Sequence, residues 1–553
     1  MASGSVLRSL ALATCGLLAS CHSQLRVETP RTETALSARE KRRLASSLDR
    51  LVAGWDGMHH GSSSKRRQAQ DQYDQALASF LREWDGHQSP RYWQSGTVFT
   101  SAAQSFQVDF DPRANARREV PPAHMDQIIL ASRKKTHADD TLAERAGVGV
   151  PVVGHVLRTL DARKEHPFMP PNGGNLTLTA VMEVEDDDAD PVTPRRCRLH
   201  LHNALNVETV KIRQDERLLA ANFTAAKDRA LSKKTMRLFS WLGLLYPERT
   251  LGDCQLYRMD SYDPQRIPVV FVHGLMSDPH IWLNTVNAIS SDPELRKKYQ
   301  PWYFLYPTGM SVPQTSERLR ASLRQACEYY DPDHNDPGMN RMILVGHSMG
   351  GLLSRMQAID PKDRLWNSIF TKPPEKLNVS ASDRERLVSN LKFKPQPEVK
   401  RLVFITTPQR GSNIAGMGIV RRLASFIRLP VDTLLLSQQL MNGNTDALSP
   451  QIRDWGFFAF LSIGTLYNEH PFYDGLNSVP IPVPYHSIIG RIGHKPLAES
   501  TDGAVPYWSS HLEGAKSEKI VPCWHGCVER PEVVKEVTRI LHEHLQESGL
   551  SRP

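Results

Sequence analysis

Cysteines and long apolar runs are both scarce in this 553-residue sequence. Seven cysteines leave an odd set beyond Cys21, so at most two disulfide bridges can form, and the spacing does not fix a pairing. Cys523 and Cys527 lie close together, but no second cysteine pair or nearby ligand cluster completes a zinc site. We therefore expect no metal, and the chemistry inferred below requires no cofactor.

A membrane-spanning segment is also missing, because the apolar run at residues 10–19 is far too short to cross a bilayer. It follows Arg8 and suits the apolar core of a secretory signal. The run ends in Leu18-Ala19-Ser20-Cys21, which resembles the lipobox of bacterial lipoproteins. This resemblance implies that residues 1–20 are a signal peptide and that Cys21 carries a diacylglyceryl anchor. An ordinary signal peptide cut near the same place is the alternative.

The lipobox resemblance leads us to expect a membrane-anchored lipoprotein of the bacterial cell envelope, on the outer membrane or facing the periplasm. Residues 21–35 are polar and would tether the chain to the lipid. The formal net charge of +8 could indicate a nucleic-acid partner or an anionic membrane surface. Because the lysines and arginines are scattered, we expect no nucleic acid and interpret the charge as a solvated surface, with weak attraction to anionic lipid as the alternative. Protein partners stay unknown.

The length exceeds that of one ordinary core, so we expect two domains. Residues 36–261 read as a smaller N-terminal α+β domain of unknown role. Its first part has apolar residues at helical spacing, and strands with alternating apolar residues follow. His200 and His202 share one face of such a strand, but two histidines alone rarely make a metal site.

From about residue 262, short apolar runs alternate with helix-length segments, which predicts a parallel sheet with helices on both faces over residues 262–548. The predicted strands are residues 268–272, 302–305, 342–345, 402–405, 486–489 and 519–521. Ligands of such sheets bind beyond the carboxyl ends of the strands. The fold class is therefore α/β, with this sheet domain preceded by the smaller N-terminal one.

A serine with a glycine two residues away on each side follows the third predicted strand, in the sequence Gly346-His347-Ser348-Met349-Gly350. This G-x-S-x-G pattern, between an apolar strand and a plausible helix, is typical of a nucleophile held in a sharp, strained turn. The small neighbours are needed where the helix and the strand approach each other. A tight turn with an incidental serine is the alternative interpretation.

A serine hydroxyl needs a base, and the base needs a carboxylate that holds its tautomer. Asp502 lies in a Gly/Pro turn beyond the fifth predicted strand, and His525 lies beyond the sixth. Ser348, Asp502 and His525 thus follow the chain order that this type of sheet requires. The competitors are weaker: His511 follows Asp502 too closely to belong to the next strand, His494 precedes the acid, and Asp474 sits in a long insertion.

The oxyanion formed during acyl transfer needs preorganised backbone N–H donors. Met349 follows the nucleophile and supplies the first expected donor. The second expected donor is Leu275, in the loop after the first predicted strand, where Gly274 lets the backbone turn close to the substrate. His273 is expected to serve as a hydrogen-bonding prop and not as a proton carrier.

Together these segments resemble the lipase-like branch of the α/β-hydrolase superfamily over about residues 262–545. The segments that carry the resemblance are Val270-Phe271-Val272-His273-Gly274-Leu275, Gly346-His347-Ser348-Met349-Gly350-Gly351, Thr407-Pro408-Gln409-Arg410-Gly411-Ser412, Asp502-Gly503-Ala504-Val505-Pro506 and His525. The resemblance implies an α/β-hydrolase fold and cleavage of lipid-like carboxylic esters through an acyl-enzyme on Ser348. Gln409 departs from the pattern, since such sequences often have His there.

The role of one insertion and the type of reaction both stay open at this point. The insertion at about residues 412–484 has an apolar helical pattern that suits either a lid opening onto lipid or a helix packed on the sheet. An acyltransferase would use the same triad and pass the acyl group to an alcohol or a lipid. A catalytically silent binding or scaffold lipoprotein is the third possibility, although the intact set of catalytic residues disfavours it.

Overall fold

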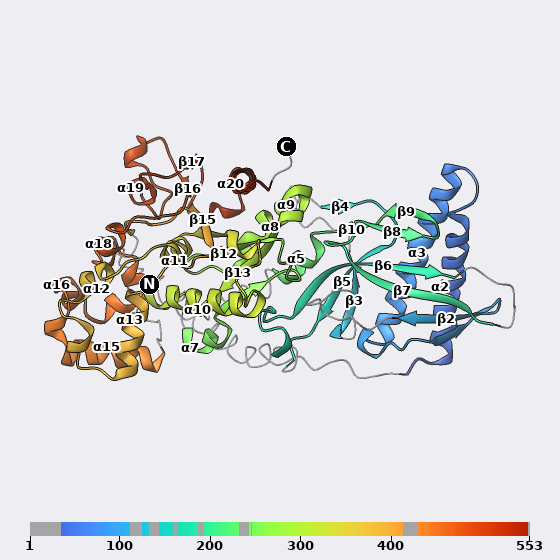
Figure 1. The fold of residues 1–553 in the computed structure, drawn as a ribbon, viewed down its shortest axis with the longest axis horizontal. Coiled ribbons are helices and arrows are strands. Elements are labelled where there is room, and N and C mark those ends of the chain that lie inside the picture. Colours follow the sequence, from blue (N-terminus) through green and yellow to red (C-terminus); the bar gives the residue numbers. More distant parts are fainter. Residues whose placement is uncertain are drawn as a thin grey trace, which may run out of the picture.

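The computed structural model describes residues 35–110, 124–131, 143–159, 164–185, 193–231, 243–244, 246–412 and 430–550 (Figure 1). The expected signal peptide, Cys21 and nearly all of the tether lie outside these residues, as does the apolar helical pattern at residues 413–429. Within the described part of the chain, no helix is both long and apolar enough to cross a membrane.

Two helices open the N-terminal unit, α2 (Ala38–Gly57) and α3 (Ser63–His87). Each begins at a serine whose side chain accepts a backbone N–H of the first turn, and Ser37 also forms a capping box with Glu40. Their apolar residues recur at helical spacing and pack into one core with the neighbouring sheet. Tyr73 of α3 is fully buried there, and its hydroxyl group exchanges hydrogen bonds with the backbone of Met182.

The sheet of this unit has six strands in the order β1-β2-β7-β6-β5-β3. Its strands are β1 (Thr97–Thr100), β2 (Ser105–Phe110), β3 (Gln127–Leu130), β5 (Val150–Val156), β6 (Gly174–Val184) and β7 (Arg195–Asn203). Two smaller pairs accompany it, formed by β4 (Glu144–Arg145) with β10 (Ala221–Asn222) and by β8 (Thr209–Ile212) with β9 (Asp215–Leu218). Long β6 and β7 are antiparallel neighbours, as the alternating apolar residues predict. The acidic loop between them lies largely outside the described residues.

The second sheet has seven strands in the order β11-β13-β12-β14-β15-β16-β17. Its strands are β11 (Gln255–Arg258), β12 (Ile267–Val272), β13 (Tyr299–Leu305), β14 (Met342–His347), β15 (Val399–Ile405), β16 (Tyr485–Gly490) and β17 (Ser517–Val521). All neighbours are parallel except β11, which pairs antiparallel with β13. Six of these strands are the predicted ones, and the α/β fold class with a mostly parallel sheet is confirmed.

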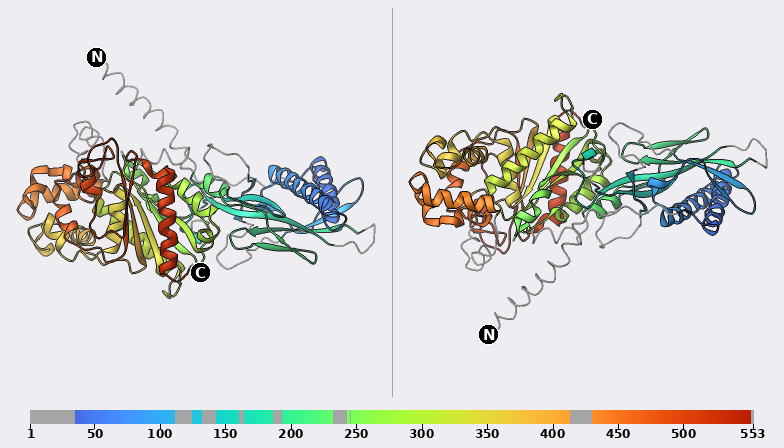
Figure 2. Two further views of the ribbon diagram at one scale, coloured as in Figure 1. Left: turned by 90° about the horizontal axis from the view of Figure 1, so that it is seen from above. Right: turned by 90° about the horizontal axis from the view of Figure 1, so that it is seen from below.

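Helices cover both faces of this second sheet, because alternate residues of its buried strands point to opposite sides and most of them are apolar. One core contains α8 (Leu283–Ser291), α9 (Pro293–Lys298) and α20 (Pro531–Glu547). The opposite core contains α10 (Val312–Tyr330) and α11 (Met349–Ala358). Figure 2 shows α20, in dark red, lying along the sheet, while α2 and α3 lie at the far end of the molecule.

The edge strand β11 corrects the expected start of the sheet. The sequence places the expected domain boundary at residue 261, but residues 255–258 already pair with β13. This strand is short and mixes polar with apolar residues because it closes an edge, so it lacks the continuous apolar run of a central strand. The sheet therefore begins earlier in the chain than its apolar runs indicate.

Further helices gather at the end of the molecule opposite α2 and α3 (Figure 1). They are α12 (Arg364–Ile369), α13 (Ala381–Leu391), α15 (Val431–Gly443), α16 (Pro450–Trp455), α17 (Ser462–Thr465) and α18 (Phe472–Asn477). Leu436 and Leu440 of α15 share a buried core with α10 and α11. The described part of the insertion is thus packed on the helices that cover the sheet.

Candidate active site

Ser348 occupies the sharp turn between β14 and α11, with φ of 52° and ψ of −124°. A positive φ is strained for a residue with a side chain, so the surrounding structure must hold it there. The turn also brings strand and helix very close together: a Cβ on Gly346 would lie 2.5 Å from the carbonyl oxygen of Gly350. The glycine pattern seen in the sequence is therefore a steric requirement of this turn.

The structure brings Ser348, His525 and Asp502 together at the carboxyl ends of β14, β17 and β16. The Ser348 Oγ lies 2.8 Å from Nε2 of His525, and Nδ1 of His525 lies 2.8 Å from Oδ2 of Asp502. Asp502 is almost fully buried, and its Oδ1 accepts the backbone N–H groups of Ala504 and Val505 at 2.8 and 2.6 Å. One imidazole therefore joins a hydroxyl group to a fixed carboxylate.

The backbone of His525 is held from three sides. Its N–H donates to the carbonyl of Asp502 at 2.9 Å, and its own carbonyl accepts from Nε2 of His347 at 2.9 Å and from Oγ1 of Thr406 at 3.2 Å. Burial lowers the pKa of His347 to about 3, so this imidazole stays neutral. Neither His347 nor Thr406 could be recognised as a positioning residue from the sequence, although His347 lies within the G-x-S-x-G pattern and Thr406 directly follows a predicted strand.

The loop after β12 lies directly against the nucleophile. A Cβ on Gly274 would be 3.0 Å from Cβ of Ser348 and 2.9 Å from Nδ1 of His347, so only glycine fits at this position. Leu275 is the next residue in the chain after Gly274, and Met349 follows Ser348 at the start of α11. Gly274 thus adjoins the Ser348 side chain, and each expected oxyanion donor directly follows one of these two residues in the chain.

His273 is fully buried, and burial lowers its pKa to about 4. Its ring stacks on Tyr306, whose hydroxyl group donates to the carbonyl of His273. The next turn is fixed at Met276, which has a φ of 55° and donates its N–H to Oγ1 of Thr308 at 3.4 Å. A neutral ring packed in this way agrees with the expected role as a prop of the loop.

The competing residues lie elsewhere or have other partners. His511 contacts Glu518 at 2.6 Å, and His494 and Asp474 are exposed. Gln409, the departure from the family pattern, is buried and accepts from the guanidinium group of Arg355 at 3.0 Å. The glutamine therefore has a structural role that ties α11 to the loop after β15.

Two groups of possible metal ligands occur in the N-terminal unit. Among the described residues, His124, Glu165 and His166 place their ligand atoms within 4.8 Å of one another. Burial, and then the positive charge of Arg258, lower the pKa of His166 to about 4. The rings of His200 and His202 stack at 5.6 Å, but His200 contacts Glu183. None of these residues belongs to the triad.

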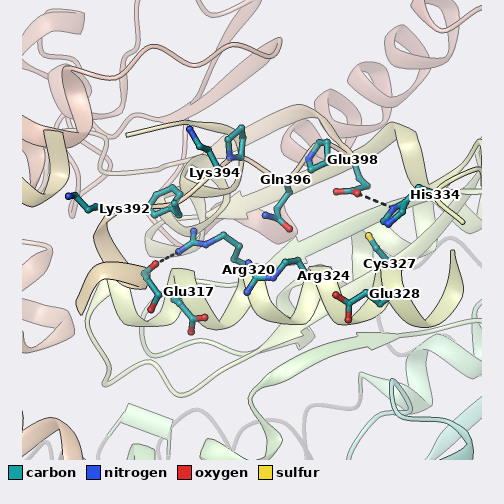
Figure 3. A pocket seen from close by; sticks show the side chains of 14 residues that line it. Glu317, Arg320, Arg324, Cys327, Glu328, His334, Lys392, Lys394, Gln396 and Glu398 are labelled. Atoms are coloured by element: carbon teal, nitrogen blue, oxygen red, sulfur yellow. Dashed lines mark hydrogen bonds and ion pairs between the residues drawn. The ribbon is translucent and has the colours of Figure 1, made fainter. Parts of the chain in front are cut away.

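A polar cavity of about 490 Å³ lies between α10 and the segment that leads into β15 (Figure 3). Arg320 and Glu317 of α10 line one side, and Phe393 and Lys394 line the other. The guanidinium group of Arg320 lies over the ring of Phe393 at 3.8 Å. Because this segment precedes β15, the cavity is at the opposite edge of the sheet from the triad.

Comparison with solved structures finds lipases and esterases. The mature form of the lipase BlEst2 from Bacillus licheniformis is 17% identical, with 52% of this chain and 97% of that chain covered and a TM-score of 0.31. EstA from Clostridium botulinum is 14% identical, with coverages of 51% and 87% and a TM-score of 0.30. Esterase B from Lactobacillus rhamnosis, inhibited by a tributyrin phosphonate, is 12% identical, with coverages of 52% and 80% and a TM-score of 0.29.

No protein-family model and no curated protein matches the chain. At these low identities and TM-scores, what the chain does must be inferred from its own side chains.

Proposed function

We propose that this protein is a serine hydrolase that cleaves carboxylic esters through a Ser348-His525-Asp502 triad. The observation that carries the proposal is the imidazole of His525, which lies 2.8 Å from the hydroxyl oxygen on one side and 2.8 Å from the carboxylate on the other. These distances are within hydrogen-bond reach for a nucleophile, a base and an orienting acid. The strained backbone of Ser348 supports the same interpretation, because such strain collects at functional sites.

The reaction begins when Nε2 of His525 takes the proton of Ser348 as Oγ attacks the ester carbonyl. Asp502 holds the proton on Nδ1 and stabilises the imidazolium ion that forms. The N–H groups of Met349 and Leu275 donate hydrogen bonds to the developing oxyanion. The imidazolium ion then gives its proton to the leaving alcohol, and the acyl group stays on Ser348. Water, activated by the same imidazole, releases the acid and restores the enzyme.

Apolar residues beside the triad favour an apolar, lipid-like ester. Met276 follows the oxyanion loop and is 42% exposed, and Trp524 precedes His525 and is 71% exposed. Large exposed apolar side chains beside a reactive group mark a surface that binds apolar ligands. Their chemistry suits an acyl chain better than a polar substrate.

An active-site phosphonate probe tests the nucleophile directly. The wild-type chain should be labelled and Ser348→Ala should not, because only an activated hydroxyl group displaces the leaving group of the phosphonate. Ser382→Ala is the matched control, since this serine is exposed on α13 and should leave labelling unchanged. Equal labelling of wild type and Ser348→Ala would end the assignment.

A panel of short esters, triacylglycerols and phospholipids would then define the substrate. Product analysis with and without an added acceptor alcohol separates hydrolysis from acyl transfer, because a transferase would form a new ester. Release of free acid alone supports the hydrolase. Transfer of most of the acyl group to the acceptor would replace it by the acyltransferase.

We also propose that the mature chain is anchored in the cell envelope through lipid on Cys21. The support is the lipobox-like sequence at residues 18–21 and the short apolar run before it. An anchored hydrolase would work next to the membrane, where lipid-like esters are found.

A further inference from the structure

Two cysteines flank the proposed base in the sequence Cys523-Trp524-His525-Gly526-Cys527. Both are buried, and both belong to the core that packs under β17 and α20. Both are free thiols in the structure, and hydrogen bonding from the Cys527 side chain lowers the pKa of Cys523. Trp524, which lies between them, points to solvent and is 71% exposed. The loop therefore turns two thiols inward to one place while its other side faces the solvent.

The thiol pair lies behind the acid of the triad. A Cβ placed on Gly490 would be 2.9 Å from Cβ of Asp502 and 3.3 Å from Sγ of Cys523, so these two groups surround the same point. The N–H of Cys523 donates to the carbonyl of Arg491, next to Gly490, at 3.1 Å. A bond between the two sulfur atoms would therefore fix the loop of residues 523–527 next to the contact between Asp502 and His525.

We propose that Cys523 and Cys527 form a disulfide bond that closes the loop around His525 and holds the imidazole between Ser348 and Asp502. The positioning part of this inference rests on the proposed function, whereas formation of the bond does not. His525 is already held through its backbone by Asp502, His347 and Thr406. The disulfide would add a covalent restraint on both sides of the same residue.

Bond formation requires an oxidant of the small-disulfide class, such as oxidised glutathione. The hydrogen bond from Cys527 lowers the pKa of Cys523 and makes it the better thiolate of the pair. The Cys523 thiolate attacks the small disulfide and releases one thiol, and the Cys527 thiolate then attacks the mixed disulfide and releases the second. The two cysteines lose two protons and two electrons in total, and the oxidant becomes two thiols. Because both sulfur atoms are buried in the folded chain, the reaction belongs to folding in an oxidising compartment.

Peptide mapping tests bond formation independently of activity. The full chain, exported to a bacterial periplasm, is denatured without reductant, alkylated and digested with trypsin. Both cysteines fall in one peptide, residues 520–535, because trypsin does not cleave between Arg530 and Pro531. We expect this peptide to be unalkylated and two hydrogens lighter than its reduced form, while Cys254 is alkylated. Full alkylation of both cysteines would overturn the proposal.

The positioning role is tested with the double variant Cys523→Ser/Cys527→Ser. We expect its thermal midpoint to fall by roughly 5 °C, the effect of opening a short disulfide loop. Its kcat for a soluble ester should fall at least roughly threefold with KM unchanged, because a loosened base spends less time in the reactive geometry. Wild type that is unfolded and refolded in the presence of a phosphine reductant should reproduce both losses relative to wild type refolded without it, and Cys254→Ser should keep the wild-type response.

The outcomes separate this inference from the proposed function. A chain that carries the disulfide but shows the same kcat with and without it would overturn the positioning role. Loss of phosphonate labelling at Ser348 in every form would count against the hydrolase, and the peptide map would still decide whether the bond exists.

Discussion

Asp502→Asn tests how the acid acts, because the hydrogen bonds of the carboxylate leave the amide only one orientation. Oδ1 accepts the N–H groups of Ala504 and Val505, and Oδ2 faces Nδ1 of His525 at 2.8 Å. In the variant, the amide oxygen must take the Oδ1 position, since an NH₂ group there would face two donors. The NH₂ group then donates to Nδ1, and the imidazole proton moves to Nε2.

An imidazole protonated at Nε2 cannot take the proton of Ser348. In a serine protease triad the corresponding substitution lowers kcat about 10⁴-fold by enforcing the wrong tautomer. At about 1.36 kcal/mol for each factor of ten, this equals roughly 5.4 kcal/mol of transition-state stabilisation. We expect a loss of that order here with KM little changed, because Asp502 is buried behind His525, away from bound substrate.

Steady-state hydrolysis of p-nitrophenyl butyrate by the purified chain gives kcat and KM, and thermal unfolding checks that the variant is folded. Asp474→Asn is the matched control, since it makes the same substitution at an exposed carboxylate on α18. A kcat of Asp502→Asn within about tenfold of the wild type would refute the tautomer reasoning, because loss of general base catalysis costs more than that. Equal losses of kcat in Asp502→Asn and Asp474→Asn would also refute the tautomer reasoning.

Three further predictions follow from other parts of the structure and sequence. Thr406→Val keeps the side-chain shape but removes a hydrogen bond to the carbonyl of His525, so kcat for the same ester should fall roughly fivefold with KM unchanged, and an unchanged kcat would contradict the positioning role. Burial lowers the pKa values of His486 and His544 to about 4, below the unfolded value of 6.5, so the unfolded chain binds more protons and stability is lost as the pH falls from 6.5 towards 4. Each histidine should contribute a loss of about 2 kcal/mol by about pH 5; equal denaturant midpoints at about pH 7.5 and about pH 5 would contradict this. Metabolic labelling with palmitate should disappear in Cys21→Ser, and label that persists would count against the lipid anchor.

The seven-stranded sheet could be predicted because its signals are local. Each central strand is a short apolar run, and the polar residues that follow β14, β16 and β17 must meet at one edge of a parallel sheet. Ser348, Asp502 and His525 could therefore be selected by chain order and by their place after a strand. Periodicity of two or of three to four residues also indicated the helices and the long hairpin of the N-terminal unit.

Contacts between distant parts of the chain could not be predicted in this way. Thr406 and the carbonyl of His525 are 119 residues apart, and His347 is 178 residues from the same carbonyl. A side chain that donates to a distant carbonyl leaves no periodic pattern in the sequence. The edge strand β11 could not be predicted because it does not pair with β12, the next strand in the chain. It pairs with β13, which follows β12. These features depend on tertiary packing and not on local propensity.

A buried ion pair joins the two sheets and bears on the role of the N-terminal unit. Lys227 of α5 (Ala225–Ala230) places Nζ 2.7 Å from Oδ1 of Asp260, just after β11, and 3.3 Å from Oγ1 of Thr177 on β6. Both charged side chains are almost completely buried. Removing one partner of such a pair typically costs about 3–5 kcal/mol, because the remaining charge stays buried without compensation. A movement that swings the N-terminal unit away from the second sheet would have to break this contact, so the ion pair favours a fixed arrangement of the two units.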